Sequence, residues 1–345
     1  MSTRAARLRR RRLVAGVVVV AALGVLGAGL AAFPDRDRPR ETGAGSAPRS
    51  ELVALAVTGA PHALLAVVGS GPAGPVALVL PPRTTVVVPG QGETVAEAVQ
   101  ALPGDSVRIA LGNLLGTWID GYAVLDLDRL AGLVDRAGGL ELELPEPVEL
   151  LGRSLPAGPA RLSGAEVAAL LGRRGPDALL RATLVLEAFL ADPPPVEAAD
   201  LLETDGAARV ARVLRAAGGA RVEPLPTETV GARVHVLEQP AADELVGRLL
   251  GTRPPLRLEV LNGSGRPNVG EEVARRLLPL GVRVVLSRNA ESFDHERTEI
   301  LATDPAFAEE AERVRRALGV GAVSVSRVPS GLADITIVVG RDLEA

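Results

Sequence analysis

The first 33 residues constrain this chain more than any other segment. An arginine-rich start, residues 1–12, leads into an uncharged apolar stretch at 13–33. At about 1.5 Å per residue, these 21 residues make a helix long enough for the roughly 30 Å hydrocarbon core of a bilayer. Only the N-terminal flank is purely basic, because the charges that return at 35–38 are mixed in sign. The positive-inside rule predicts a single-pass helix in the cytoplasmic membrane, with the N-terminus inside and the bulk of the chain extracytoplasmic.

A cleaved signal peptide is the alternative for the same segment. Its apolar core would normally be about 7–15 residues long and would end at a small-residue cleavage site. The apolar stretch here is longer, although Ala-Gly-Leu-Ala-Ala at 28–32 resembles a cleavage site. Length therefore favours an uncleaved anchor.

Composition restricts the chemistry of the rest of the chain. There is no cysteine, which excludes a disulfide, a thiolate nucleophile and a cysteine metal site. The three histidines, His62, His235 and His295, are far apart in sequence and predict no zinc site. All 38 basic residues are arginine and the net charge is −4, so nucleic acid is disfavoured as a partner. Aromatic residues make up only 2% of the chain, so the core is expected to be aliphatic.

Apolar runs separated by Gly and Pro predict two α/β domains after the anchor. Residues 34–50 lack apolar periodicity and predict a flexible linker. The first domain is expected at 51–252, and a smaller α/β domain is expected at 256–345. Strands are expected at 52–58, 63–68, 76–80, 85–88, 122–127, 140–144, 233–237, 258–261, 282–287 and 335–339. Helices are expected at 94–102, where Thr94 and Glu97 suit a capping box, and at 128–137, 163–172, 178–191, 207–217, 241–250, 270–280 and 305–318.

Five stretches together resemble one bacterial family. Residues 116–128, 133–147 and 155–169 (GTWIDGYAVLDLD, LVDRAGGLELELPEP and LPAGPARLSGAEVAA) resemble the central part of LytR-CpsA-Psr (LCP) proteins. Residues 258–265 and 334–343 (LEVLNGSG and DITIVVGRDL) resemble the LytR C-terminal domain that is often appended to it. The order of anchor, LCP-like domain and C-terminal domain is itself an architecture of that family.

This resemblance implies a function in the cell envelope. LCP proteins are membrane-anchored phosphotransferases with an α/β/α domain, and they move glycopolymers from a polyprenyl-pyrophosphate carrier onto the cell wall. The implied partners are a polyprenyl-phosphate-linked glycan, cell-wall polymer or other envelope proteins, and the membrane. Mg²⁺ is the cofactor that the family implies, because a divalent cation offsets charge on the leaving phosphate.

The chain departs from the family where metal-binding carboxylates are expected. Ala63 stands at the first of these positions. The family's Pro-Arg-Asp turn corresponds to Pro82-Arg83-Thr84, so Thr84 stands at the second. A neutral hydroxyl does not replace a carboxylate as a Mg²⁺ ligand, and no metal ligand is assigned. Arg83 is retained and is a candidate ligand for a phosphate group.

Four further candidates for the phosphate site lie in the segment that corresponds to a later arginine motif of the family. They are Arg173, Arg174, Asp177 and Arg181. A guanidinium group binds phosphate oxygens in a bidentate manner, which supports the assignment of the arginines. Alternatively, each arginine lies on a solvated helix face, and Asp177 caps the helix that follows. No catalytic residue is assigned.

Two functional hypotheses from different classes follow. The first is an LCP-type envelope protein of cell-wall glycopolymer assembly that binds a polyprenyl-pyrophosphate-linked glycan, and is a phosphotransferase if catalysis survives. The second is a catalytically inactive scaffold that presents the C-terminal domain to its partners. A dinucleotide site at 263–270 is disfavoured, because the glycines lack the G-x-G-x-x-G spacing. Transcriptional regulation is disfavoured, because most of the chain is predicted to be exported.

Overall fold

The computed structural model describes residues 51–59, 64–81, 83–95, 102–230, 234–326 and 331–343. The predicted anchor at 13–33 and linker at 34–50 lie outside these residues. Within the described ranges, no helix has the length and apolar character needed to cross a membrane. Apart from Gly331 and Leu332, the described residues belong to one compact unit, Arg49–Pro329 with Ala333–Ala345.

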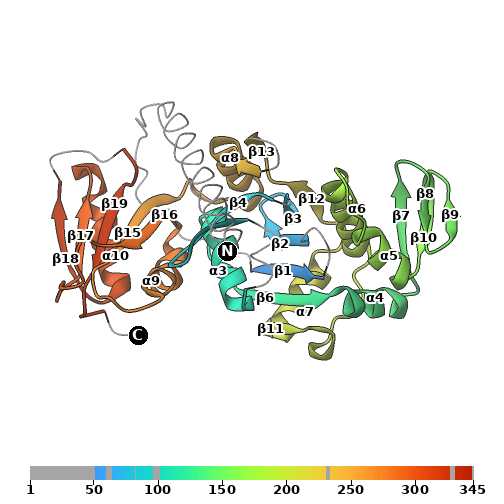
Figure 1. Ribbon diagram of the computed structural model, residues 1–345, viewed down its shortest axis with the longest axis horizontal. Helices are drawn as coiled ribbons and strands as arrows, with labels where there is room; N and C mark the ends of the chain where they lie inside the picture. The colour runs from blue at the N-terminus through green and yellow to red at the C-terminus, as the bar shows by residue number, and fades with distance from the viewer. Residues whose placement is uncertain are drawn as a thin grey trace, which may run out of the picture. The chain divides into compact units, whose positions relative to one another are not determined.

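A six-stranded sheet lies at the centre of the N-terminal module, the name used below for residues 51–252 (Figure 1). Its order is β11-β6-β1-β2-β3-β12. The strands are β1 (Leu52–Thr58), β2 (Leu64–Gly71), β3 (Gly74–Leu80), β6 (Gly121–Asp126), β11 (Glu203–Asp205) and β12 (Arg221–Pro224). β1 is parallel to β6, β3 is parallel to β12, and β2 is antiparallel to both β1 and β3. β1, β2 and β3 are nearly continuous apolar runs, which need cover on both faces.

Helices provide that cover on both faces and give three layers. One face packs against α4 (Leu127–Arg136), α5 (Gly164–Leu171), α6 (Ala178–Ala191) and α7 (Ala207–Ala216). The other face packs against α3 (Gly104–Leu115) and α8 (Gln239–Leu250). The predicted mixed α/β fold is therefore confirmed. The two-stranded sheets are β4 (Thr85–Val88) with β5 (Gly92–Val95), β7 (Leu140–Leu144) with β10 (Gly158–Leu162), β8 (Val148–Leu150) with β9 (Arg153–Leu155), and β13 (Thr227–Val230) with β14 (Val234–Leu237).

The C-terminal module, the name used for residues 256–343, has a second sheet of five strands in the order β16-β15-β19-β17-β18. The strands are β15 (Leu256–Asn262), β16 (Val282–Asn289), β17 (Glu299–Ala302), β18 (Ala322–Val325) and β19 (Ile335–Val339). Its helices are α9 (Val269–Leu277) and α10 (Ala308–Leu318). β15 is parallel to both β16 and β19, and β17 is antiparallel to β19. The strand β16 is thus at one edge of the sheet.

Most predicted elements are present, and two differences are informative. The bounds of β1 and β4 agree with the prediction, and α4 begins at Leu127 after its N-cap Asp126, which accepts a hydrogen bond from the Arg129 amide at 2.8 Å. The prediction that Thr94 starts a helix is wrong, because Thr94 lies in β5; residues 96–101 of that helix lie outside the described residues. The helix α3 was not predicted. Its residues are buried on almost every side, so they lack the apolar periodicity of a surface helix.

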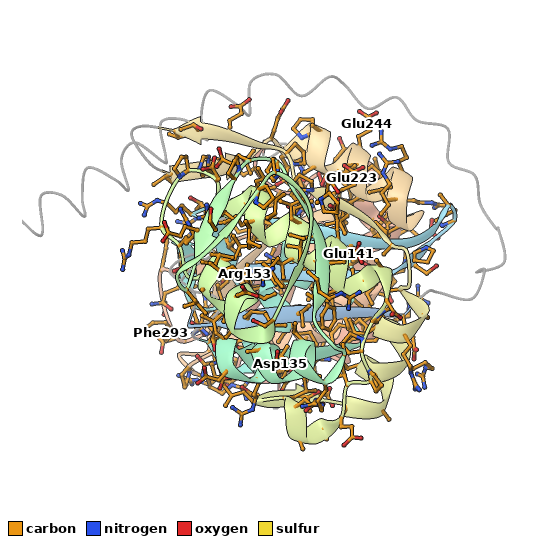
Figure 2. All side chains as sticks on the ribbon, turned by 90° about the vertical axis from the view of Figure 1, so that its right-hand side faces the viewer. Asp135, Glu141, Arg153, Glu223, Glu244 and Phe293 are labelled. Carbon is orange, nitrogen blue, oxygen red and sulfur yellow. The ribbon has the colours of Figure 1, made fainter. Side chains whose placement is uncertain are left out.

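The start of α5 is fixed by a capping box. Ser163 accepts from the Glu166 amide, and the Glu166 carboxylate accepts from the Ser163 amide at 2.9 Å. Arg153 donates to the same carboxylate at 2.8 Å. Burial acts to raise the pKa of Glu166, but the hydrogen bonds from Ser163 and the charge of Arg153 outweigh it and hold this pKa below its ordinary value. Figure 2 faces this end of the module, with Arg153, Glu141 and Asp135 labelled.

The lowered pKa of Glu166 predicts an acid-sensitive contribution to stability. The contribution is present at neutral pH, where the carboxylate is charged in both states, and is lost as the pH falls below about 4.5 toward the folded pKa. Glu166→Gln should lower the free energy of unfolding at pH 7 and weaken its dependence on pH below about 4.5. Urea unfolding at several pH values measures both effects. An unchanged pH dependence in the variant would contradict the prediction.

A second prediction concerns the close contact between α4 and α5. A Cβ atom on Gly164 would lie 2.0 Å from the Ala131 carbonyl oxygen, so the two helices approach only because this residue is glycine. Gly164→Ala should therefore destabilise the fold by about 1–3 kcal/mol. Gly132 in α4 is the control, because its Cβ would meet no atom closer than 3.8 Å. Gly132→Ala should stabilise the fold by up to about 1 kcal/mol, and thermal unfolding distinguishes the two signs.

Candidate functional site

Four strands of the first sheet end at one edge, and this edge is the candidate site. Thr58 at the end of β1 pairs with Asp126 at the end of β6. Leu80 at the end of β3 pairs with Leu65 near the start of β2, and Pro224 ends β12 beside Val79. In open α/β sheets, ligands bind in the crevice outside the carboxyl ends of parallel strands. The topology therefore favours this edge for a binding site.

An apolar cavity of about 20 Å³ lies between this edge of the sheet and the helices α4, α6 and α7. Every side chain that lines it is apolar: Leu55, Val57, Leu64, Leu125, Leu130, Leu133, Val185, Leu186, Phe189, Val196, Leu201 and Leu214. These residues come from β1, β2, β6, α4, α6, α7 and the segment that links α6 to α7. The cavity offers no polar side chain to a ligand. Its lining suits a hydrocarbon and not a sugar or a nucleotide.

Arg181 lies in α6 one turn before Val185, a residue of the cavity lining. Residues four apart lie on one face of a helix, so Arg181 and Val185 share a face. The Arg181 guanidinium donates to the Arg173 carbonyl oxygen at 2.6 Å, and its Nε is buried without a hydrogen-bond partner among the described residues. Burial lowers the pKa of Arg181, and Arg173 acts in the same direction, while Asp177 and Glu146 oppose it. The cation is thus partly desolvated beside an apolar cavity, which is a suitable place for an anionic group.

The structure brings Arg173 and Asp177 close to Arg181. Arg173 is exposed and donates to the Glu149 carbonyl oxygen of β8 at 3.0 Å. Asp177 occupies the N-cap position of α6, but its side chain makes no capping hydrogen bond. Arg174 is exposed next to Arg173 in the connection from α5 to α6. Asp177 therefore occupies the N-cap position, as the alternative predicted, but its side chain does not cap the helix.

Arg83 is positioned by a different part of the chain. It is exposed in the turn after β3 with a φ of 62°, a left-handed conformation that is uncommon for a residue other than glycine. Its carbonyl oxygen accepts from the His235 amide of β14 at 3.1 Å. The turn follows Leu80, so Arg83 belongs to the same sheet edge as the cavity. The assignment of Arg83, Arg173, Arg174, Asp177 and Arg181 to a phosphate site stays a prediction.

The residues present do not fit the Mg²⁺ that the resemblance implies. Thr84 is fully buried, and its hydroxyl donates to the Pro81 carbonyl oxygen at 2.7 Å, so it is not directed at a ligand. Ala63 lies outside the described residues. The Asp126 carboxylate is engaged with Arg129 at the start of α4. Across the described ranges, no group of three His, Asp or Glu residues could hold a metal ion.

The sequence analysis did not predict the cavity, although it predicted α6, which provides part of the lining. Val185, Leu186 and Phe189 follow the spacing of an amphipathic helix, which predicts burial but not an open space beside it. The other lining residues come from segments up to 159 positions apart, Leu55 to Leu214. A cavity that arises from such distant segments has no local sequence pattern.

Comparisons with known proteins agree with the predicted resemblance. Residues 255–343 match the model of the LytR_C family, described as LytR cell envelope-related transcriptional attenuator. No curated protein matches the sequence. The structure is similar to Bacillus subtilis TagV (14% identity, TM-score 0.49, 61% of this chain and 100% of TagV). It is also similar to an Actinomyces oris LytR-Csp2A-Psr enzyme (22%, 0.46, 58% and 89%) and to TagT of B. subtilis (18%, 0.47, 62% and 96%).

The cavity lining predicts a large effect of truncating Phe189, which is only 5% exposed. Phe189→Ala should destabilise the fold by about 3–5 kcal/mol, because it removes buried apolar surface and enlarges an existing cavity. Leu180 on the same helix is 45% exposed and provides the control. Leu180→Ala should change the free energy of unfolding by less than about 0.5 kcal/mol. Equal effects of the two substitutions in urea unfolding would contradict the burial of Phe189.

Proposed function

We propose that this protein is an LCP-type envelope protein that binds a polyprenyl-pyrophosphate-linked glycan in cell-wall glycopolymer assembly. One observation carries the proposal: an entirely apolar cavity lies at the carboxyl edge of the sheet, and the partly desolvated Arg181 is one helical turn from Val185 of its lining. The LytR_C domain at 255–343 supports a place in the envelope. Of the TagT structures that this chain resembles, one has bound octaprenyl pyrophosphate lipid and another is bound to LI-WTA. Octaprenyl pyrophosphate combines a hydrocarbon chain with phosphate groups.

The two ends of such a ligand need different environments. An isoprenoid chain gains about 25 cal/mol for each Å² of apolar surface that leaves water, so it favours the Leu- and Val-lined cavity. A pyrophosphate favours guanidinium groups, which bind its oxygens in a bidentate manner. We assign this role first to Arg181, with Arg173, Arg174 and Arg83 as further candidates. Asp177 would then act on Arg181 through its charge and not on the anion.

Ligand entry requires the cavity to widen, because about 20 Å³ holds little more than one water-sized group. The helix α6 provides three of the lining residues. It is bounded by Gly175-Pro176 on one side and by Pro193-Pro194-Pro195 on the other, where the helical hydrogen bonds stop. We therefore expect α6 to move away from the sheet as one rigid element when the lipid binds.

The residues of this chain support ligand binding better than they support phosphotransferase activity. Phosphoryl transfer with Mg²⁺ needs carboxylate ligands, and the buried Thr84 supplies none. This observation favours the second candidate function, a scaffold without transferase activity that presents the C-terminal module to wall polymer or to another envelope protein. The proposed location is the cytoplasmic membrane, with residues 13–33 as a single-pass anchor, the N-terminus inside and both modules outside.

Binding of an isoprenoid pyrophosphate to the full chain tests the proposal. Titrations with farnesyl pyrophosphate, farnesol and inorganic pyrophosphate, each with and without Mg²⁺, separate the two ends of the ligand. Farnesyl pyrophosphate should bind most tightly, because it alone engages both the cavity and the arginines. Arg181→Ala should weaken its binding by about 10- to 100-fold, and Arg83→Ala should weaken it further in the double variant.

Arg313 provides the matched control for these titrations. It is exposed on α10, far along the chain from the candidate site, so Arg313→Ala should leave the affinity unchanged. Equal affinities for farnesyl pyrophosphate and inorganic pyrophosphate would exclude the apolar cavity as the lipid site. Absence of binding by any probe would favour the scaffold. Tighter binding with Mg²⁺ would instead support transferase activity.

A further inference from the structure

The helix α3 contacts strands of both sheets, β1 and β6 of the first and β16 of the second. On one side, Val107, Ala110 and Leu111 belong to the apolar cluster of the first sheet. On the other side, Ile109 is fully buried within the apolar cluster of the C-terminal module. A helix with apolar contacts all round requires cover on every side. Each sheet provides part of this cover, so neither module alone can bury α3.

A side chain of α3 also completes the hydrogen bonding of an edge strand. Asn113 is 2% exposed, and its Oδ1 accepts from the Val284 amide of β16 at 2.7 Å. Its Nδ2 donates to the Val284 carbonyl oxygen at 3.0 Å. One amide group thus pairs with both backbone groups of Val284, as a neighbouring strand would. The exposed edge of the second sheet is protected at this position by a residue 171 positions away in the sequence.

A largely buried ion pair lies next to this contact. Arg283, 8% exposed, donates to the Asp243 carboxylate of α8 at 2.7 Å and to the Leu114 carbonyl oxygen at 2.8 Å. It also donates to the Asn113 carbonyl oxygen at 3.3 Å. The last carbonyls of a helix lack amide partners further along the helix, and this arginine provides a donor for that of Leu114. The Asn113 carbonyl oxygen also accepts from the amide of the C-cap Gly116 at 3.2 Å. Removal of either charge would leave the other one buried and unpaired.

Close backbone contacts continue the interface. The Gly90 amide donates to the Ser287 hydroxyl at 3.1 Å, and a Cβ atom on Gly270 would lie 2.5 Å from the Gly90 nitrogen. A Cβ atom on Gly116 would lie 2.4 Å from the Pro255 side chain. Asp105 at the start of α3 also pairs with Arg275 of α9 at 2.6 Å. Because of these close contacts, the two modules are packed against each other and are not joined only by a flexible linker.

We infer that the LytR_C-like domain of this chain has a fixed position against the N-terminal module, because α3 covers one side of its sheet. The two modules should therefore unfold together, as one folding unit. The family match starts at residue 255, so it excludes α3, the helix that contributes Ile109 to the apolar cluster and pairs with Val284 through Asn113. A partner of the C-terminal module would have to bind elsewhere than the β16 edge. This inference does not depend on the proposed function.

Unfolding of the full chain in urea, followed by two signals, tests the inference. The single tryptophan, Trp118, packs against the apolar cluster of the C-terminal module, so its fluorescence reports on the interface. Far-ultraviolet circular dichroism reports on all helices and strands. The two curves should coincide in one transition. Separate transitions would overturn the inference.

Hydrogen exchange in two variants tests whether the contact between Asn113 and Val284 stabilises the strand β16. Asn113→Leu keeps the volume of the side chain but removes both bonds to Val284, so exchange of β16 amides should become about 10- to 100-fold faster. The control is Asn289→Leu, at the exposed end of the same strand, which should leave the protection of Val284 unchanged. Unchanged protection in Asn113→Leu would contradict the inference.

A double-mutant cycle of Arg283→Ala and Asp243→Ala tests the ion pair between the modules. It provides an independent test of the inference if Asn113→Leu does not fold. The double variant should lose less protection in β16 than the sum of the single variants, because it leaves no unpaired charge. Additive losses would contradict a direct contact between the modules.

Discussion

The central strands β1, β2 and β3 have aliphatic side chains on both faces, and the rest of the structure depends on how these faces are covered. With an aromatic content of 2%, the chain has few large rings to fill space and uses many Val, Leu and Ala side chains instead. Four helices cover one face and two cover the other. The candidate site and the contact between the modules are consequences of this arrangement, one on each face.

On the first face, packing of Leu, Val and Phe side chains from the sheet and the helices leaves a small space unfilled. The cavity lies where the ends of β1 and β6 meet α4, α6 and α7. Arg181 lies one helical turn before Val185 of the cavity lining and donates to the Arg173 carbonyl oxygen. Its partial burial lowers its pKa, because desolvation disfavours the charged form.

The sequence predicted those elements whose own residues determine them. Apolar runs bounded by Gly and Pro defined β1 and β4 to the residue, and the start of the helix predicted at 128–137 was placed within one residue of that of α4. It could not predict α3, since a helix buried on all sides has no polar face, nor β12, whose four residues pair only with β3. For the site, the sequence named charged residues such as Arg83 and Arg181. It could not place them relative to a cavity that seven separate segments enclose, and it could not show that the Thr84 hydroxyl is turned to a backbone carbonyl.

The position of α3 has a consequence for biosynthesis. Asn113 and Val284 are 171 residues apart, and ribosomes add about 5–20 residues per second. Roughly 10–30 seconds therefore pass between the synthesis of α3 and that of β16. Throughout this interval the outward face of the helix, with Ile109, has no partner and is exposed to other apolar surfaces. Until the last strands are made, this apolar face lacks its folded cover, and a chaperone that binds near residue 109 would shield it.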